Sequence, residues 1–428
     1  MKKLGLLLLL PPLLFYGCQH YQHASPIPKV KSICLIDRNG ISETISNVDR
    51  LKQYERIDFL CNQPYQKVLR IYHRNQNGDI QAFINSYYPN GQPKQYLEVV
   101  NSRAYGTYQE WFENGGRKLE AFVIGGEPDI NPSAENTWLF DGNSCSWNDE
   151  EVLLAVIPYE KGILEGESLY YHSNGNVWKR VPFCENEVHG NFETYLETGE
   201  LLQQTNYYKG KKSGRSYRYW HPDQLASEEE YCDDLLQQGF YYDSVGTLVS
   251  QIQDGNGYKA VFGKTEVSES QEYQKGVQEG EVKIFGADRK PVRKYSVKNN
   301  LKHGEDIEYD DHPARRDRPK LLITWHEGKI QGIVKTWYDN GVQESNREMS
   351  NNTKNGISTA WYRDGSLMLL EEYEHNKLLK GEYFSRAEKQ PISTIKEGKG
   401  VATLFDSEGN FLRKITYEKG IPADDLCL

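Results

Sequence analysis

The strongest constraint on the fold of this chain is a phrase of about 24 residues that recurs along most of its length. Each copy places an aromatic residue four positions before the glycine of an Asn-Gly-like turn, and where that glycine is missing the neighbouring copies set the register. A second glycine often lies five residues before the aromatic one. Such recurrence predicts a repeat architecture, which grows along one axis instead of around one core. The aromatic column comprises Tyr87, Trp111, Trp138, Tyr171, Tyr195, Tyr219, Tyr242, Phe262, Phe285, Tyr309, Trp337, Trp361, Phe384 and Phe405.

The chemistry of one repeat predicts a β-hairpin. Dipeptides such as Asn340-Gly341 and Asp364-Gly365 tolerate positive φ at both corners of a type I′ turn, and Asp141-Gly142 has the same form. The links between repeats are too short for a parallel crossover, so neighbouring strands should be antiparallel. We therefore expect an all-β fold, an elongated and twisted antiparallel β-meander or solenoid of about fourteen hairpin repeats.

The first residues of the chain are typical of an export signal. A short positive segment ends at Lys3 and an apolar stretch follows to Leu14, too short to span a bilayer comfortably. Gly17-Cys18 then resembles the lipobox of bacterial lipoproteins, although Phe15 and Tyr16 depart from its usual residues. That resemblance implies cleavage before Cys18 and a lipid anchor on it. Ordinary secretion and an uncleaved anchor are the alternatives.

These features divide the chain into a signal peptide (1–17), a lipidated tether (18–30), an N-terminal capping segment (31–64), the hairpin repeats (65–420) and a C-terminal tail (421–428). No aspartate follows the cysteine as an inner-membrane retention signal. We therefore expect a lipid-anchored protein of the cell envelope, at the outer membrane in preference to the inner one.

Several classes of function are disfavoured. The net charge is −10 and the basic residues are scattered, which argues against nucleic-acid binding. The chain has no Gly-x-Ser-x-Gly elbow, no phosphate-binding glycine loop and no Cys/His pair, so we expect no enzyme and no cofactor. The histidines lack partners at ligand spacing, so we expect no metal. The acidic run 228–230 is interpreted as a solvated sheet face.

The cysteines allow one disulfide to be favoured over another. Cys184 and Cys232 lie two repeats apart, about 19 Å in a flat sheet, which is too far for a bridge. Cys34 and Cys61 in the capping segment are the better candidates.

The aromatic residues have two interpretations. As structure, the column is the main apolar layer that such an array possesses. As function, exposed rings would stack on sugars. The residues directly after the column should point to the opposite face by strand alternation, and we expect this face to bind a partner. Its aromatic members are Tyr88, Phe112, Trp220, Tyr338 and Tyr362.

An insertion at 310–320 interrupts the array. It is rich in proline and arginine, and insertions in repeat arrays often lie on the binding face. Arg315 and Arg316 are therefore candidate partner contacts.

The aromatic pair, the Asn-Gly turn and the glycine-rich link resemble the variant MORN repeats of bacteria, often named YwqK-type antitoxin components. The resemblance covers about residues 65–420, and together with the leader it is similar to exported lipoproteins of chlamydia-type bacteria. It implies an extended β-meander and says little about activity.

The expected function is a non-catalytic, membrane-anchored extracytoplasmic scaffold that binds another protein through an extended β-surface. The first alternative is binding of envelope glycans through exposed aromatic rungs. The second is a toxin-neutralising, antitoxin-like partner, which rests on the family name alone and would require a cytoplasmic location.

Overall fold

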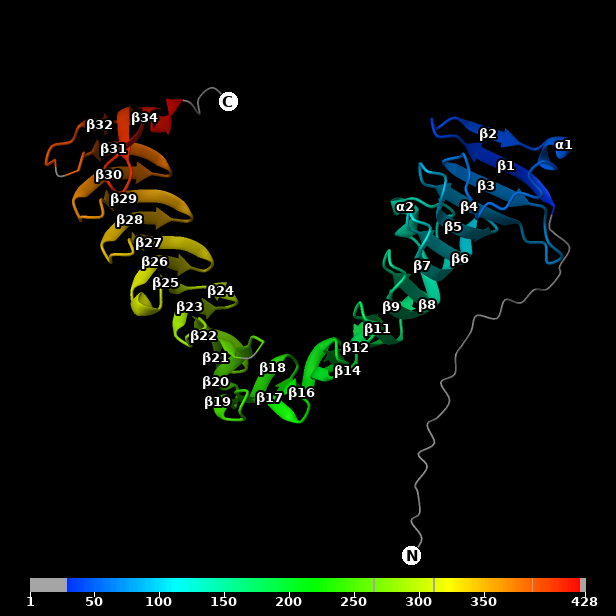
Figure 1. Cartoon of the computed structure of the whole chain (residues 1–428), viewed down its shortest axis with the longest axis horizontal. Coiled ribbons are helices and arrows are strands. Elements are labelled where there is room, and N and C mark those ends of the chain that lie inside the picture. Colours follow the sequence, from blue (N-terminus) through cyan, green and yellow to red (C-terminus); the bar gives the residue numbers. More distant parts are fainter. Residues whose placement is uncertain (1–28, 265, 311, 387, 424–428) are drawn as a thin grey trace, which may run out of the picture. The chain divides into compact units, whose positions relative to one another are not determined.

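The computed structural model describes residues 29–264, 266–310, 312–386 and 388–423. These residues form 35 strands, two four-residue helices and one 3-10 turn, and all paired strands are antiparallel (Figure 1). The predicted all-β meander is thus confirmed. The leader and Cys18 lie outside the described residues. No helix among the residues that are described is long and apolar enough to cross a membrane.

The chain divides into two compact units, Met1–Glu151 and Val152–Leu428. In unit 1, β1 pairs with β2 on one side and with β3 on the other, and the strands then follow one another in chain order. Its elements are β1 (Val30–Ile36), β2 (Ser42–Ile45), α1 (Val48–Leu51), β3 (Lys67–Tyr72), β4 (Gln81–Tyr87), β5 (Pro93–Val100), β6 (Arg103–Trp111), β7 (Arg117–Gly125), α2 (Pro132–Glu135) and β8 (Leu139–Trp147).

Unit 2 continues the same pattern: successive long strands pair with each other along the chain, and each two-residue strand pairs, among the described residues, only with the strand before it. Unit 2 has more than two strands per repeat. The reason is that in some repeats the second half of the link is interrupted, so that a separate two-residue strand precedes the long strand. The elements of unit 2 are β9 (Leu153–Glu160), β10 (Ile163–Leu164), β11 (Gly166–Tyr171), β12 (Val177–Cys184), β13 (Glu187–Val188), β14 (Gly190–Tyr195), β15 (Leu201–Tyr208), β16 (Lys211–His221), β17 (Gln224–Cys232), β18 (Leu235–Tyr242), β19 (Leu248–Gln253), β20 (Asn256–Phe262), β21 (Val267–Gln274), β22 (Val277–Phe285), β23 (Pro291–Lys298), β24 (Leu301–Lys302), β25 (Gly304–Tyr309), η1 (Pro313–Arg315), β26 (Pro319–His326), β27 (Lys329–Trp337), β28 (Gln343–Ser350), β29 (Thr353–Trp361), β30 (Leu367–Glu374), β31 (Lys377–Tyr383), β32 (Ser393–Lys396), β33 (Lys399–Phe405), β34 (Phe411–Glu418) and β35 (Ile421–Pro422).

The Asn-Gly turns differ from the predicted type I′ geometry. At the tip of β27 and β28, Gly341 has a φ of +87° and its N–H donates to the carbonyl of Tyr338, while Asn340 does not adopt positive φ. The tip is therefore a type I turn followed by one left-handed glycine, which makes a bulge. This geometry leaves the Asn340 side chain to accept from Val342 N at 3.0 Å and to donate to the Arg363 carbonyl of the next tip at 2.9 Å. Asparagine is used here to join neighbouring hairpins.

The same amide bridge recurs at other tips. Asn90 Nδ2 donates to the Glu113 carbonyl at 3.1 Å, and Asn114 Nδ2 donates to the Asp149 carbonyl at 2.9 Å. Successive tips on this edge are thus tied together by side-chain to backbone hydrogen bonds.

Type I′ turns occur instead at the opposite edge, where one hairpin passes to the next. Both residues of each such turn have positive φ, as in Asn351-Asn352 with 47° and 65°. The second residue also bonds one repeat back: Asn352 N donates to the Ile330 carbonyl, and Asn352 Oδ1 accepts from Ile330 N at 2.8 Å. Both edges of the array are therefore linked to neighbouring repeats.

The structure corrects the repeat that was expected at Trp138. Asp141 and Gly142 lie within β8 at an irregularity in its pairing with β7, so they form no hairpin turn. Trp138 follows α2, is 7% exposed and packs on Tyr108 with 4.6 Å between ring centroids. The aromatic residue at the end of this strand is Trp147, four positions before Glu151, whose φ of 64° takes the place of the turn glycine. The helix-bearing insertion before β8 displaced the register.

Two clusters in unit 2, 142 residues apart, each hold a buried glutamate between two tyrosine hydroxyls, and among the described residues only the first adds a lysine. In the first, buried Glu229 accepts hydrogen bonds from the hydroxyls of Tyr231 and Tyr241, each at 2.9 Å, and pairs with Lys259 Nζ at 2.7 Å. In the second, Glu371 accepts from Tyr373 at 3.1 Å and from Tyr383 at 2.8 Å. Glu229 is 6% exposed, so the solvated-face interpretation of its acidic run is wrong at this residue. Two tyrosine donors and a lysine compensate for its burial.

The cysteines carry no disulfide of the expected kind. Cys34 lies in β1 and Cys61 in the loop before β3, and both are free thiols, so the favoured pairing between them is wrong. The Cys61 thiol instead contacts Asp58 Oδ2 at 3.3 Å. Cys184 and Cys232 are free and exposed.

Candidate functional site

The rings of the aromatic column are partly covered by the array. Tyr87, Trp138 and Phe384 are buried, and the other members are half-buried. Rings in this position pack against neighbouring repeats and leave little face for a stacked ligand.

The residues after the column join one repeat to the next. The Tyr88 hydroxyl donates to the Trp111 carbonyl at 2.9 Å, and the Tyr338 hydroxyl donates to the Trp361 carbonyl at 2.8 Å. The Trp220 indole N–H donates in the same way to the Tyr242 carbonyl at 3.0 Å. In every case the acceptor is the column residue of the following repeat.

This arrangement changes the expectation of an exposed aromatic face. Tyr362 is 0% exposed and donates to the Phe384 carbonyl at 2.7 Å, so it cannot contact a partner in the folded protein. Tyr88, Phe112, Trp220 and Tyr338 are half-buried. Only part of each ring is accessible, and sequence alternation could not reveal this because the strand is bulged at the column.

The insertion at 310–320 and the aromatic pair Trp337-Tyr338 form a hollow of about 530 Å³ in unit 2. The insertion contains η1 and connects β25 to β26, and the neighbouring hairpin tip supplies the aromatic residues. The lining residues are Asp310, His312, Arg315, Pro319, Lys320, Trp337, Tyr338 and Asp339. The structure thus brings together Arg315 and Tyr338, which the sequence marked as partner-binding candidates for separate reasons.

The two arginines of the insertion have different places. Arg315 Nε pairs with Asp310 Oδ2 at 2.9 Å at the side of the hollow. Arg316 is turned away: its side chain is 10% exposed, pairs with Asp288 at 3.2 Å and donates to the Asp310 carbonyl at 3.1 Å. Arg316 therefore fastens the insertion to the tip of β22 and β23 and offers little to a partner, in contrast to its expected role.

Local electrostatics keep the hollow charged. The backbone N–H of His312 and the guanidinium of Arg315 lower the pKa of Asp310. Burial raises the pKa of Tyr338, so its hydroxyl stays neutral. The Arg363 guanidinium lies 5.5 Å from the centroid of the Tyr338 ring. The hollow therefore offers half-buried aromatic rings beside fixed charges of both signs.

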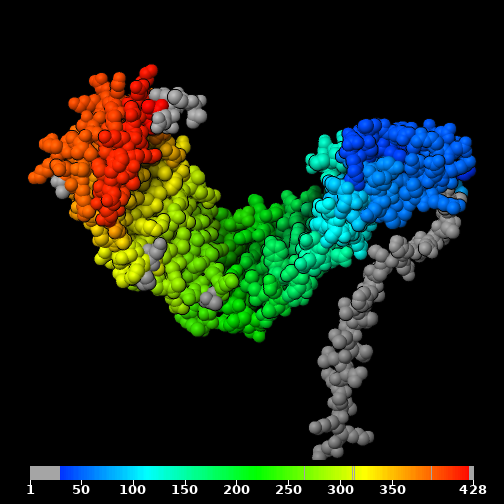
Figure 2. All heavy atoms as spheres, turned by 45° about the horizontal axis from the view of Figure 1, so that its top comes forward, coloured from blue at the N-terminus to red at the C-terminus, as the bar shows by residue number. Residues whose placement is uncertain are grey.

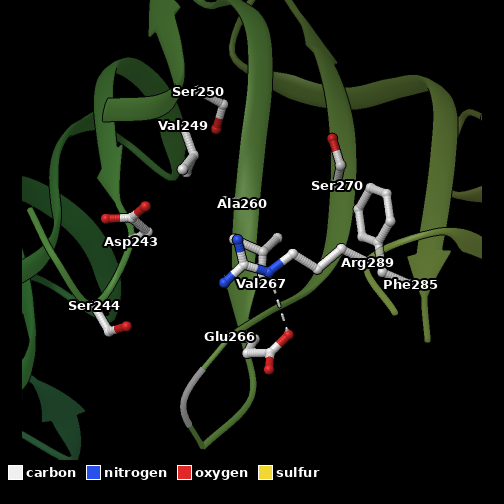
Figure 3. Close-up of a pocket in the computed structure, with 10 residues that line it drawn as sticks. All are labelled: Asp243, Ser244, Val249, Ser250, Ala260, Glu266, Val267, Ser270, Phe285 and Arg289. Carbon is white, nitrogen blue, oxygen red and sulfur yellow. Dashed lines mark ion pairs between the residues drawn. The ribbon is translucent and has the colours of Figure 1, made fainter. Parts of the chain in front are cut away.

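A second pocket of about 270 Å³ lies between the tips around β20 (Figure 3). Val249, Val267 and Phe285 give it apolar walls, and the Arg289 guanidinium pairs with Glu266 at 3.6 Å. The Ser250 hydroxyl is buried and has no hydrogen-bond partner among the described residues. No motif marks this pocket in the sequence, because it arises where a repeat is shortened to 20 residues between Tyr242 and Phe262.

No group of three metal-ligating side chains is found within the described ranges. Buried Glu229 lines a small cavity of about 150 Å³ with Ser216 and Ser227, and its carboxylate is held there by Tyr231, Tyr241 and Lys259.

Comparison with known proteins gives one family match. Residues 164–185 match the MORN repeat variant model, and they cover one complete hairpin, β11 and β12 with its tip. No curated protein matches the chain.

Two solved structures are similar at 10% identity. One is the crystal structure of TcdB2-TccC3 without its hypervariable C-terminal region, where the similarity covers 80% of this chain and 24% of that one at a TM-score of 0.16. The other is TcdB2-TccC3-TEV, covering 89% of this chain and 29% of that one at a TM-score of 0.11. The chain thus spans about a quarter of their length, and scores of this size establish no common fold. The matched hairpin supports a MORN-type repeat as the unit from which this chain is built.

Proposed function

We propose that this protein is a non-catalytic scaffold that binds another protein, with the hollow beside the insertion as its main contact. The observation that carries the proposal is that Trp337, Tyr338 and Arg315 line one hollow. Tryptophan, tyrosine and arginine are the residues that dominate binding energy at protein interfaces, above all in partly enclosed sites.

The charged residues of the hollow also suit a protein ligand. Arg315 and Asp310 are already paired, so they are held in place before a partner arrives, which lowers the entropic cost of binding. Polar groups of both signs around aromatic rings are typical of an interface with a polar rim.

The glycan alternative has less support. Sugar binding needs broad aromatic faces open to solvent, whereas the column rings are buried or half-buried. The antitoxin-like alternative has no structural feature in its favour and remains tied to the family name.

We also propose that a lipid on Cys18 anchors the scaffold in the cell envelope, at the outer membrane in preference to the inner one. The support is the lipobox-like segment ending in Gly17-Cys18. Incorporation of labelled palmitate into the wild type but not into Cys18→Ser would agree with this proposal. Equal labelling of both would contradict it.

The protein-binding proposal is tested by capture from the cell envelope of the source organism. The chain from Ser25 onward contains every described residue and would be used with envelope fragments that are intact or protease-treated. We expect binding that protease removes and that Tyr338→Ala or Arg315→Ala weakens at least fivefold. The matched control is Tyr208→Ala, an exposed tyrosine (53%) outside the hollow. Binding that survives protease and is displaced by free sugars would favour the glycan alternative.

A further inference from the structure

The last long strand of unit 2 has an edge that no described strand covers. β34 pairs with β33 along Phe411–Tyr417 on one side. On the other side only Tyr417 and Glu418 are paired, with the two residues of β35. Within the described part of the chain, the backbone from Phe411 to Thr416 has no partner there. Phe411 and Leu412 are each 59% exposed, and the strand lies at the end of the unit (Figures 1 and 2).

Two earlier strands show what such an edge receives. β12 and β23 have the same surroundings as β34: each is followed by a type I′ turn and then a two-residue strand, β13, β24 or β35. The registers coincide, because Val177, Pro291 and Phe411 each lie opposite the column residue of the preceding strand.

The equivalent positions on all three strands are basic. Arg413 and Lys414 in β34 correspond to Arg293 and Lys294 in β23, and to Lys179 and Arg180 in β12. The basic pair is not general to such strands, because β9 is also followed by a type I′ turn and a two-residue strand but carries Ala155 and Val156 at these positions.

In the two internal repeats that carry the basic pair, at β12 and β23, the next strand meets it with acids. Arg293 lies opposite Glu308 of β25 and forms a double hydrogen bond with buried Asp306, each at 2.8 Å. Arg180 lies opposite Glu193 of β14, with 3.9 Å between the charged atoms. At β34 the corresponding cations are exposed.

Arg413 and Lys414 form no ion pair with any described residue. An unpaired edge of this kind presents open backbone N–H and C=O groups, on which an extended segment can add as a further strand.

We propose that the edge of β34 that no described strand covers binds an extended segment of a partner protein that carries acidic residues opposite Arg413 and Lys414. The inference deepens the proposed scaffold function and rests on it only in taking the occupant to be a partner protein. It concerns a different surface from the hollow and has its own chemistry: backbone pairing for affinity, and a carboxylate at a defined register for specificity.

A second copy of this chain is a poorer occupant. Two β34 edges paired with each other would bring Arg413 and Lys414 close to the same residues of the other copy, and like charges in facing strands repel. Pairing of β34 with edge strand β2 of a second copy is also disfavoured. The acid of β2, Glu43, is already paired with Arg50 at 2.8 Å.

The test uses a labelled peptide with the sequence of residues 304–310, the internal strand whose place beside Arg293 and Lys294 is known. Fluorescence anisotropy with the full chain should show saturable binding at low salt. We expect the double variant Arg413→Glu/Lys414→Glu to weaken it at least tenfold, and an acid-free peptide with Asn and Gln at the carboxylate positions to bind equally weakly. The matched control is Lys396→Glu/Lys399→Glu, which reverses two exposed lysines elsewhere.

Other outcomes overturn the proposal. Equal binding to the wild type and to the β34 variant, or no binding at all, would show that the edge does not accept acidic strands. Binding that appears only after deletion of residues 424–428 would assign the edge to the chain's own end. A dimer in sedimentation that the β34 variant abolishes would assign it to a second copy. Tyr338→Ala should leave peptide binding unchanged, so failure of this proposal is distinguishable from failure of the hollow.

Discussion

The hydroxyl of Tyr362 donates a 2.7 Å hydrogen bond to the backbone carbonyl of Phe384, although the two residues belong to successive repeats. The tyrosine is 0% exposed, and burial raises its pKa to about 12, so it remains a neutral donor throughout the physiological range. This bond is the most enclosed of the series that joins one hairpin to the next.

Tyr362→Phe should destabilise unit 2 by about 1–3 kcal/mol, because it leaves a buried carbonyl without a donor while keeping the ring. Tyr338→Phe is the matched control: its bond to Trp361 is similar, but the residue is half-buried and water can replace the hydroxyl. Urea unfolding followed by fluorescence compares the two variants. An equal effect of both substitutions would contradict the dependence on burial.

Substitution of Asn114 tests the hydrogen bond that its side chain makes to the next hairpin tip. Asn114→Asp keeps the acceptor for Gly116 N but loses the donor to the Asp149 carbonyl, so we expect a loss of about 0.5–1.5 kcal/mol. Asn114→Ala loses both bonds and should cost more. Hydrogen exchange at the amides of these two tips measures the local effect, and protection that is unchanged in both variants would show that the bridge is dispensable.

Asp306 should make the stability of unit 2 dependent on pH. Burial alone would raise the pKa of this carboxyl, but hydrogen bonds from Arg293 and Lys302 outweigh it and lower the pKa below its usual 3.8. The stabilisation is therefore present above about pH 4 and is lost as the pH falls through the lowered pKa.

Asp306→Asn removes this charge at nearly constant size. We expect about 2–4 kcal/mol less stability at pH 7, because two partly buried cations lose their counter-ion. The difference from the wild type should begin to shrink at about pH 4, where the unfolded carboxyl takes up a proton, and should level off once the pH falls below the lowered pKa of the native carboxyl. Denaturant unfolding from pH 2 to 7 measures it, and a constant difference over that range is the contrary result.

The two clusters around Glu229 and Glu371 predict equal responses to equal substitutions. Leu236 and Leu378 occupy the same place in each and are both 0% exposed. Leu236→Ala and Leu378→Ala should each cost about 2–5 kcal/mol, as large-to-small changes in a packed core do. Calorimetry of the two variants checks this, and effects that differ by more than about 2 kcal/mol would contradict the equivalence.

The repeat and its antiparallel hairpins could be predicted from sequence because period and turn composition are local signals. The turn type at Asn340-Gly341 could not, because Asn tolerates positive φ yet here serves a neighbour 23 residues away. The register failed at Trp138 because an insertion containing α2 carries an aromatic residue and an Asp-Gly pair of its own.

Individual residues of the candidate site could be predicted from the sequence, but their arrangement could not. Arg315 and Tyr338 could each be chosen from composition and spacing, but their meeting in one hollow depends on how the insertion folds over the next tip. The burial of Tyr362 and Arg316, and of Glu229 within an acidic run, depends on contacts between repeats that no single repeat encodes.

The ties at both edges of the array also determine how it would respond to force. Each tie joins residues only about one repeat apart, as between Asn352 and Ile330 or Asn340 and Arg363. A chain pulled by its two ends would therefore load these bonds one hairpin at a time, and each rupture would release about 24 residues while the rest stayed folded. If the proposed lipid anchor and the proposed partner at β34 hold the two ends, such stepwise yielding would let the protein lengthen under load without unfolding all at once.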